Sequence, residues 1–123
     1  LPPYPFDDEA IYDENSRNAA VVFEREGDRR EPSERRAGDA REPPEGIHIE
    51  DAKRVDGQWR AAGESGMPLV VTGKGETMAA AREQAYGRIE DIIIPNMYYR
   101  DDIGERWITG DADRLQAWGY LGA

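Results

Sequence analysis

Residues 67–91 read MPLVVTGKGETMAAAREQAYGRIED, and this stretch decides the fold. Its opening run at 67–72 has the continuous apolar composition that is typical of a buried strand. Pro68 has no backbone N–H to donate, so it must lie at the start of this strand or on a sheet edge. The glycines at 73–77 then predict a turn that leads from the strand into a helix.

The helix after this turn is the clearest element in the sequence. Thr77 is a good N-cap, because its hydroxyl can accept a hydrogen bond from a free N–H of the first helical turn. Residues at three- and four-residue spacing form one face: Met78, Ala81, Ala85, Ile89 and Ile92. This spacing predicts a helix from 78 to about 91. We expect Pro95 to end it, because the residue before a proline is pushed out of the α region.

Shorter strands are predicted on both sides of this unit. Residues 19–24 have the β-branched and aromatic content of a strand. Residues 47–50 alternate apolar and polar side chains, and Asp56-Gly57 is a strong turn signal, so we expect a hairpin over 47–59. Residues 96–104 have an aromatic centre that favours a strand, and an Asp-Asp pair and a glycine that favour a turn.

Together these elements predict an α+β fold, a small antiparallel sheet or partial barrel of about four to six strands with one main packed helix. The proline-rich start predicts an extended, proline-led linker over 1–18, followed by a single domain over 19–123. Residues 25–46 carry no large apolar side chain, so we expect a mobile loop there. The tail at 107–123 holds enough apolar side chains to dock on the body of the domain.

The composition excludes several functions. Of 123 residues, 26 are acidic and 16 are basic, and the formal net charge of -10 would repel nucleic acid and anionic membrane surfaces. The chain has no cysteine, which excludes disulfides, thiolate metal sites and cysteine nucleophiles. No apolar stretch approaches the roughly 20 residues that a membrane span needs. We therefore expect a soluble domain with neither a nucleic acid nor a membrane as its partner.

The turn before the helix is a candidate phosphate contact. Gly73, Lys74, Gly75 and Thr77 lie where free N–H groups and the helix dipole can hold an anion. The pattern lacks the spacing and order of the P-loop signature, and a two-glycine turn needs no ligand to exist. A purely structural turn is therefore the alternative.

The segment at 99–104 is the densest group of polar functions beside aromatic residues. Arg100 could hold a phosphate or carboxylate through two parallel hydrogen bonds, and Asp102 could orient Arg100 or accept from an amine. These two residues are the candidate substrate-binding pair. The alternative is a salt-bridged turn that closes the domain.

No catalytic or metal-ligating residue can be assigned from the sequence. His48 is the only histidine, and it lies in a predicted strand with no cysteine or second histidine at ligand spacing. For the same reason no Ser/His/Asp set can be argued.

In order, the turn at 73–77, the alanine-rich helix with Ala85-Tyr86, and the closing Tyr99-Arg100-Asp101-Asp102-Ile103-Gly104 resemble the end of phosphoribosylamine-glycine ligases. That family has an apolar strand followed by Gly-x-Thr, a helix carrying Ala-Tyr, and a closing Tyr-Arg-x-Asp-Ile-Gly. The resemblance covers 67 to about 107, and residues 1–66 match in outline. It implies the C-terminal domain of a cytoplasmic ligase of the ATP-grasp class.

This resemblance also implies the reaction and its partners. Such a ligase joins glycine to 5-phosphoribosylamine and hydrolyses ATP to ADP and phosphate. ATP and magnesium would be held by the preceding ATP-grasp domains of the same enzyme, so we expect this segment alone to bind no cofactor and to be inactive. Two alternatives stay open: a non-catalytic interaction module of the same fold, and the C-terminal domain of another ATP-grasp enzyme such as a biotin carboxylase.

Overall fold

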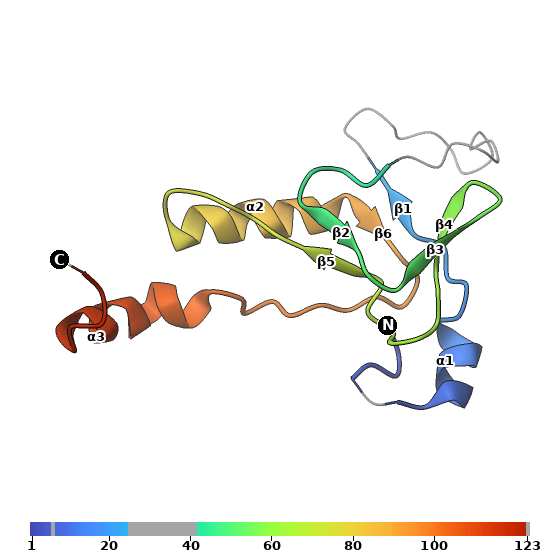
Figure 1. Ribbon diagram of the computed structural model, residues 1–123, viewed down its shortest axis with the longest axis horizontal. Helices are drawn as coiled ribbons and strands as arrows, with labels where there is room; N and C mark the ends of the chain where they lie inside the picture. The colour runs from blue at the N-terminus through green and yellow to red at the C-terminus, as the bar shows by residue number, and fades with distance from the viewer. Residues whose placement is uncertain (6, 25–41, 123) are drawn as a thin grey trace.

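The computed structural model describes residues 1–5, 7–24 and 42–122, and these form an α+β domain. The helices are α1 (Glu9–Asn15), α2 (Met78–Glu90) and α3 (Ala112–Ala117), and a helical segment kinked at Gly110 (φ 147°), η2 (Trp107–Asp111), leads into α3. The strands are β1 (Val22–Phe23), β2 (Ile47–Ile49), β3 (Ala52–Val55), β4 (Gln58–Ala61), β5 (Leu69–Val71) and β6 (Ile92–Ile93). Figure 1 shows the strands gathered around the C-terminal end of α2.

Among the described residues, every strand pair is antiparallel, in three two-stranded ladders: β1 with β6, β2 with β5, and β3 with β4. Backbone hydrogen bonds continue the pairing between the ladders. The N–H of Val21 donates to the Trp59 carbonyl (2.9 Å), which joins the segment before β1 to β4. The N–H of Glu50 donates to the Pro68 carbonyl (3.0 Å), which extends the β2–β5 pairing towards β3. The expected single sheet is therefore three small antiparallel sheets, which these backbone hydrogen bonds and an isolated bridge between Ala20 and Arg60 link to one another.

The Asp56-Gly57 turn was predicted correctly, but the first strand of its hairpin was not. Asp56 and Gly57 both have positive φ (50° and 76°), as a two-residue turn with this twist requires. The turn joins β3 to β4, whereas residues 47–49 pair with β5 instead. The chain changes partner at Asp51, whose side chain turns inwards to bind the loop at 64–66.

Helix α2 begins as predicted, and its end has a different cause. The hydroxyl of Thr77 accepts a hydrogen bond from the N–H of Ala80 (3.1 Å), so Thr77 is the N-cap. The helix stops at Glu90, well before Pro95, because Ile92 leaves the helix and pairs with Phe23 in the β1–β6 ladder. Ile92 was expected on the helical face; instead it is a buried strand residue.

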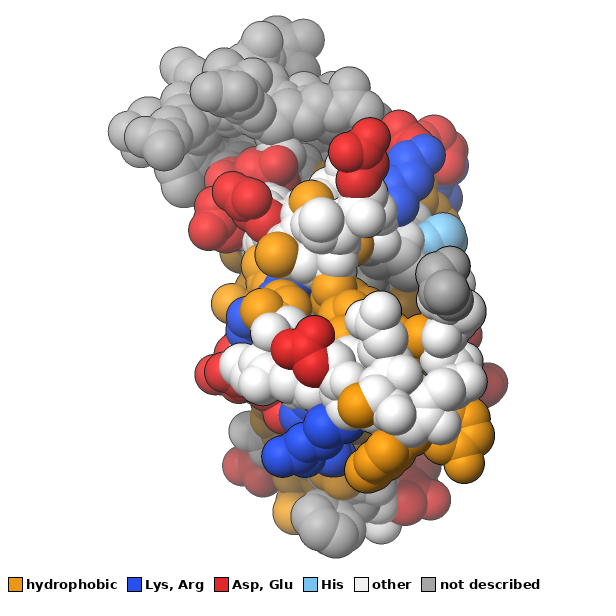
Figure 2. Space-filling model, turned by 90° about the vertical axis from the view of Figure 1, so that its left-hand side faces the viewer, with side chains coloured by type: hydrophobic (Ala, Val, Ile, Leu, Met, Phe, Trp, Pro, Cys, Tyr) orange, Lys and Arg blue, Asp and Glu red, His pale blue; other side chains and the backbone are white. Residues whose placement is uncertain are grey.

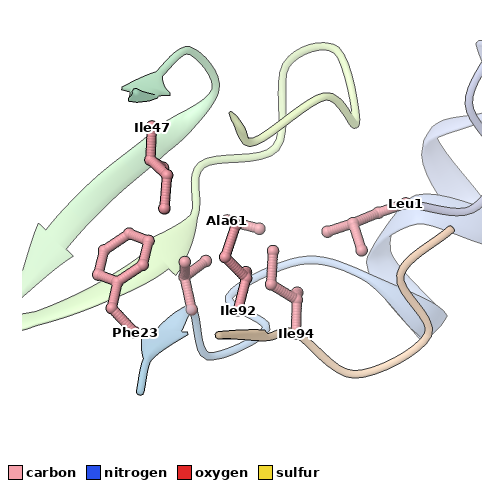
Figure 3. Close-up of a cluster of buried hydrophobic side chains, with 7 residues drawn as sticks. Leu1, Phe23, Ile47, Ala61, Ile92 and Ile94 are labelled. Atoms are coloured by element: carbon pink, nitrogen blue, oxygen red, sulfur yellow. The ribbon is translucent and has the colours of Figure 1, made fainter. Parts of the chain in front are cut away.

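The core is small and gathers distant parts of the chain, as Figure 3 shows. Its members are Leu1, Val21, Phe23, Ile47, Ala61, Ile92 and Ile94. Leu1 lies in this cluster, and α1 follows it, capped by the Asp8 carboxylate, which accepts from the N–H of Ile11 (3.1 Å). The described part of the expected linker at 1–18 therefore packs on the domain, because the side chains of Leu1 and Tyr12 are buried.

The expected mobile loop at 25–46 lies mostly outside the described residues, which resume at Glu42. From Glu42 onwards the chain is bound to the strands: Glu42 forms an ion pair with Arg54 (2.6 Å), and the Gly46 carbonyl accepts from the N–H of Thr72 (2.8 Å).

The tail differs from the expected docked segment. Residues 94–106 run back along α2, η2 lies against the N-terminal end of α2, and α3 lies beyond that end (Figure 1). Trp118 and Tyr120, which were expected to dock, are 69% and 77% exposed.

Candidate functional site

Both groups of residues singled out in the sequence lie against α2. The segment 73–77 enters its N-terminus and packs on Ala81 and Ala85. The segment 99–104 lies on the neighbouring face of the helix, against Arg82 and Tyr86. One helix therefore positions both candidate sites.

Arg100 and Asp102 form an ion pair with two parallel hydrogen bonds. Nε of Arg100 donates to Oδ1 of Asp102 (2.9 Å), and Nη2 donates to Oδ2 (3.0 Å). The hydrogen bonds from Arg100 lower the pKa of the Asp102 carboxyl below its ordinary value, and the same bonds raise the pKa of the guanidinium. The Arg100 side chain is 73% exposed, so its other N–H groups face solvent.

This arrangement is suited to binding an anion. A guanidinium has five N–H donors in a fixed plane, and Asp102 uses one edge of that plane. The free edge can bind a carboxylate or a phosphate, while Asp102 holds the group in one orientation. Among the described residues, Asp102 is the acid that forms an ion pair with Arg100, and no other acid does so.

Two residues of α2, which the sequence did not single out as site residues, hold this segment. The Tyr86 hydroxyl donates to the carbonyl of Arg100 (2.6 Å) and accepts from the N–H of Ile103 (3.1 Å). Nη2 of Arg82 donates to the carbonyl of Asp101 (2.8 Å). The available signal was their four-residue spacing, which places Arg82 and Tyr86 side by side on a helix.

The glycines at 73–77 are required by packing against α2. A Cβ at Gly73 would overlap the carbonyl oxygen of Ala81 and lie 2.7 Å from the N of Ala85. A Cβ at Gly75 would lie 2.8 Å from the Cβ of Ala80.

Several polar groups of this turn already have partners within the chain. The N–H of Lys74 donates to Oε1 of Gln84 (2.9 Å), and the Thr77 hydroxyl caps the helix. Nζ of Lys74 lies 3.6 Å from a carboxylate oxygen of Glu45. These contacts give the glycine turn a structural role.

A second polar centre, at Asp51, was missed by the sequence analysis. Oδ2 of Asp51 accepts from the backbone N–H groups of Glu64 (2.9 Å), Ser65 (2.6 Å) and Gly66 (3.0 Å), and Asp51 is 8% exposed. Burial alone would raise the pKa of this carboxyl, but the three N–H donors lower it below its ordinary value. Oδ2 of this carboxylate is used by its own chain, so Asp51 fixes the loop at 64–66.

Beside this loop lies a hollow of about 460 Å³ between the N-terminal segment and residues 63–65. Its charged lining residues are Asp7, Asp8, Glu9, Glu64 and Arg17. Glu9 is 3.7 Å from Arg17, and Asp8 caps α1, so two of these acids have structural roles. Tyr12 also lines the hollow, and burial together with the Asp51 charge raises the pKa of its hydroxyl.

The described residues contain no group of three or more His, Asp or Glu side chains that could hold a metal ion. His48, the only histidine, lies with Nε2 3.2 Å from the Thr72 hydroxyl across the β2–β5 ladder. Over the same ranges, none of the helices has the length and apolar character needed to cross a membrane.

The comparison with known proteins gives one informative similarity. No protein-family model and no solved structure matches the chain. The phosphoribosylamine–glycine ligase of Corynebacterium ammoniagenes is 34% identical over 84 residues, which are 60% of this chain and 18% of that ligase. The chain thus spans less than a fifth of its relative's length, and it is similar to a segment of a phosphoribosylamine–glycine ligase.

Proposed function

We propose that this chain is the C-terminal domain of an ATP-dependent carbon–nitrogen ligase of purine synthesis. The complete enzyme would join glycine to 5-phosphoribosylamine and hydrolyse ATP to ADP and phosphate, giving glycinamide ribonucleotide. The observation that carries this proposal is the 34% identity over 84 residues to a phosphoribosylamine–glycine ligase. Because the relative is much longer than the chain, preceding domains would supply most of the catalytic centre.

In this proposal Arg100 binds an anionic group of a substrate. Glycine carries a carboxylate and 5-phosphoribosylamine carries a phosphate, and both groups match the planar donor edge that Asp102 leaves free. Asp102 would keep the guanidinium oriented before the substrate arrives, which lowers the entropic cost of binding. ATP and magnesium would be bound by the preceding domains of the same enzyme.

A non-catalytic interaction module is the second candidate, and the exposed side chains near the C-terminus favour it. Several large apolar residues there are exposed: Tyr98, Tyr99, Ile103, Ile108, Trp118 and Tyr120. Figure 2 shows the end of the molecule that carries α3, where hydrophobic side chains reach the surface between acidic and basic ones. This mixture is less apolar than the continuous patches that mark large permanent interfaces.

The test is substrate-dependent release of ADP by the complete polypeptide that contains this chain. We expect ADP release only when glycine and 5-phosphoribosylamine are both present, with glycinamide ribonucleotide as the product. ADP release that requires bicarbonate and biotin would assign the chain to a carboxylase instead. Absence of ATP hydrolysis with either set of substrates would favour the interaction module.

A further inference from the structure

The segment that carries Arg100 and Asp102 has no place in a strand ladder. Residues 97–100 have no regular secondary structure, and the chain turns at 103–104. Its position therefore depends on side chains from outside the segment. Those described contacts come from α2, through Arg82 and Tyr86.

Tyr86 holds the segment on both sides of Asp102. A phenolic hydroxyl has one proton to donate and lone pairs to accept with, so it can donate to the Arg100 carbonyl and accept from the Ile103 N–H at once. These two bonds fix the backbone at Arg100 and at Ile103, the residues on either side of Asp101 and Asp102. Loss of the hydroxyl alone would break both bonds while the ring stays in place.

Arg82 supplies the third bond and also supports Tyr86. Its guanidinium donates to the Asp101 carbonyl and lies 5.6 Å from the centre of the Tyr86 ring. The ring of Tyr99, the residue before Arg100, lies 6.1 Å from that of Tyr86. Nε of Arg82 is buried without a partner among the described residues, which disfavours this position energetically. The contacts to Asp101 and Tyr86 offset that cost.

We infer that Tyr86 and Arg82 are positioning residues that set the orientation in which Arg100 presents its free N–H groups to an anionic substrate oxygen. The inference rests on the proposed function and names two further residues for the same site. The substrate group is a carboxylate or a phosphate, and the Michaelis constants for glycine and for 5-phosphoribosylamine separate these two sources. Neither Tyr86 nor Arg82 touches the substrate.

The test is a double-mutant cycle in the complete ligase with Tyr86→Phe, Arg100→Ala and the combined variant. We expect Tyr86→Phe to lower kcat/KM about tenfold, mainly by raising KM for one substrate, and to have almost no further effect once Arg100 is alanine. Arg82→Lys keeps a hydrogen-bond donor, so its kcat/KM should fall less than that of Arg82→Ala. Tyr98→Phe is the matched control, because Tyr98 is 51% exposed and no hydrogen bond of its hydroxyl is recorded in the described residues.

Hydrogen exchange separates a failure of this inference from a failure of the proposed function. Hydrogen exchange in the same complete polypeptide should become faster over 99–104 in Tyr86→Phe, because the bond from the Ile103 N–H is lost. If Arg100→Ala impairs the ligase while Tyr86→Phe leaves kinetics and exchange unchanged, the inference fails and the proposed function stands. The inference also fails if the combined variant loses kcat/KM by the product of the losses in the two single variants, because the two residues would then act independently. If the wild-type polypeptide has no ligase activity, the proposed function fails, the substrate role of Tyr86 fails with it, and exchange alone shows whether Tyr86 holds the segment.

Discussion

Gly73 lies so close to α2 that a methyl group in place of its hydrogen would overlap the carbonyl oxygen of Ala81. Gly73→Ala must therefore displace the helix backbone, and overpacking of this kind lowers the free energy of unfolding by about 1–3 kcal/mol. The control is Gly87→Ala, at a position within α2 itself where an added Cβ meets nothing within 4 Å. It should raise stability by about 0.5–1 kcal/mol, because alanine favours the helix. Denaturant unfolding of both variants measures the difference, and equal stabilities would contradict the packing argument.

Asp51→Asn should also destabilise the fold. The substitution keeps the shape of the side chain but removes the charge that accepts from the N–H groups of Ser65 and Gly66, and charge-assisted bonds of this kind contribute about 1.5–3 kcal/mol. Glu50→Gln changes a neighbouring exposed carboxylate and should stay within about 0.5 kcal/mol of the wild type. A loss in Asp51→Asn no larger than in this control would show that the loop is held by other contacts.

The lowered pKa of Asp51 predicts how stability depends on pH. Above the ordinary aspartate pKa of about 4, the carboxyl is ionised in both the folded and the unfolded chain, and its stabilising contribution is complete. As the pH falls through that value, the unfolded chain takes up the proton first, so the contribution declines until the pH is below the folded pKa. The free energy of unfolding should therefore fall less steeply below pH 4 in Asp51→Asn than in the wild type. If the free energy of unfolding fell equally steeply with pH in both proteins, the lowered pKa of Asp51 would be contradicted.

Local signals predicted part of the fold. The Thr77 cap and the Asp56-Gly57 turn depend on hydrogen bonds and dihedral angles within a few residues, and both were predicted correctly. The pairing of β2 with β5, and of β1 with β6, joins segments that are distant in the sequence, so no local pattern could predict it. Helix α1 has few apolar residues, and its packing depends on contacts of Tyr12 with residues 63 and 66.

The candidate site could be predicted only in part, for the same reason. Arg100 and Asp102 are close in sequence, and their ion pair follows from the polar cluster. The contribution of Tyr86 depends on how a segment without secondary structure runs along α2, and that path is set by tertiary packing. The buried carboxylate of Asp51 likewise depends on a loop that lies 13 to 15 residues away.

The isolated chain should bind ATP weakly or not at all in the presence of magnesium. The proposed function assigns ATP and magnesium to the preceding domains, and the turn at 73–77 lacks the spacing and order of the P-loop signature. Calorimetry with ATP and magnesium measures the affinity. A dissociation constant in the low micromolar range, about -7 to -8 kcal/mol, would demand a nucleotide site in this chain and would contradict the division of roles proposed above.

The central claim is that this chain completes the substrate site of a ligase through Arg100, and steady-state kinetics of Arg100→Ala in the complete enzyme test it most directly. The side chain is largely exposed, so the fold and the melting temperature should change little. Loss of a charge-assisted contact to a substrate anion should lower kcat/KM roughly tenfold to a hundredfold. A well-folded Arg100→Ala enzyme with unchanged kcat/KM for both glycine and 5-phosphoribosylamine would contradict the claim.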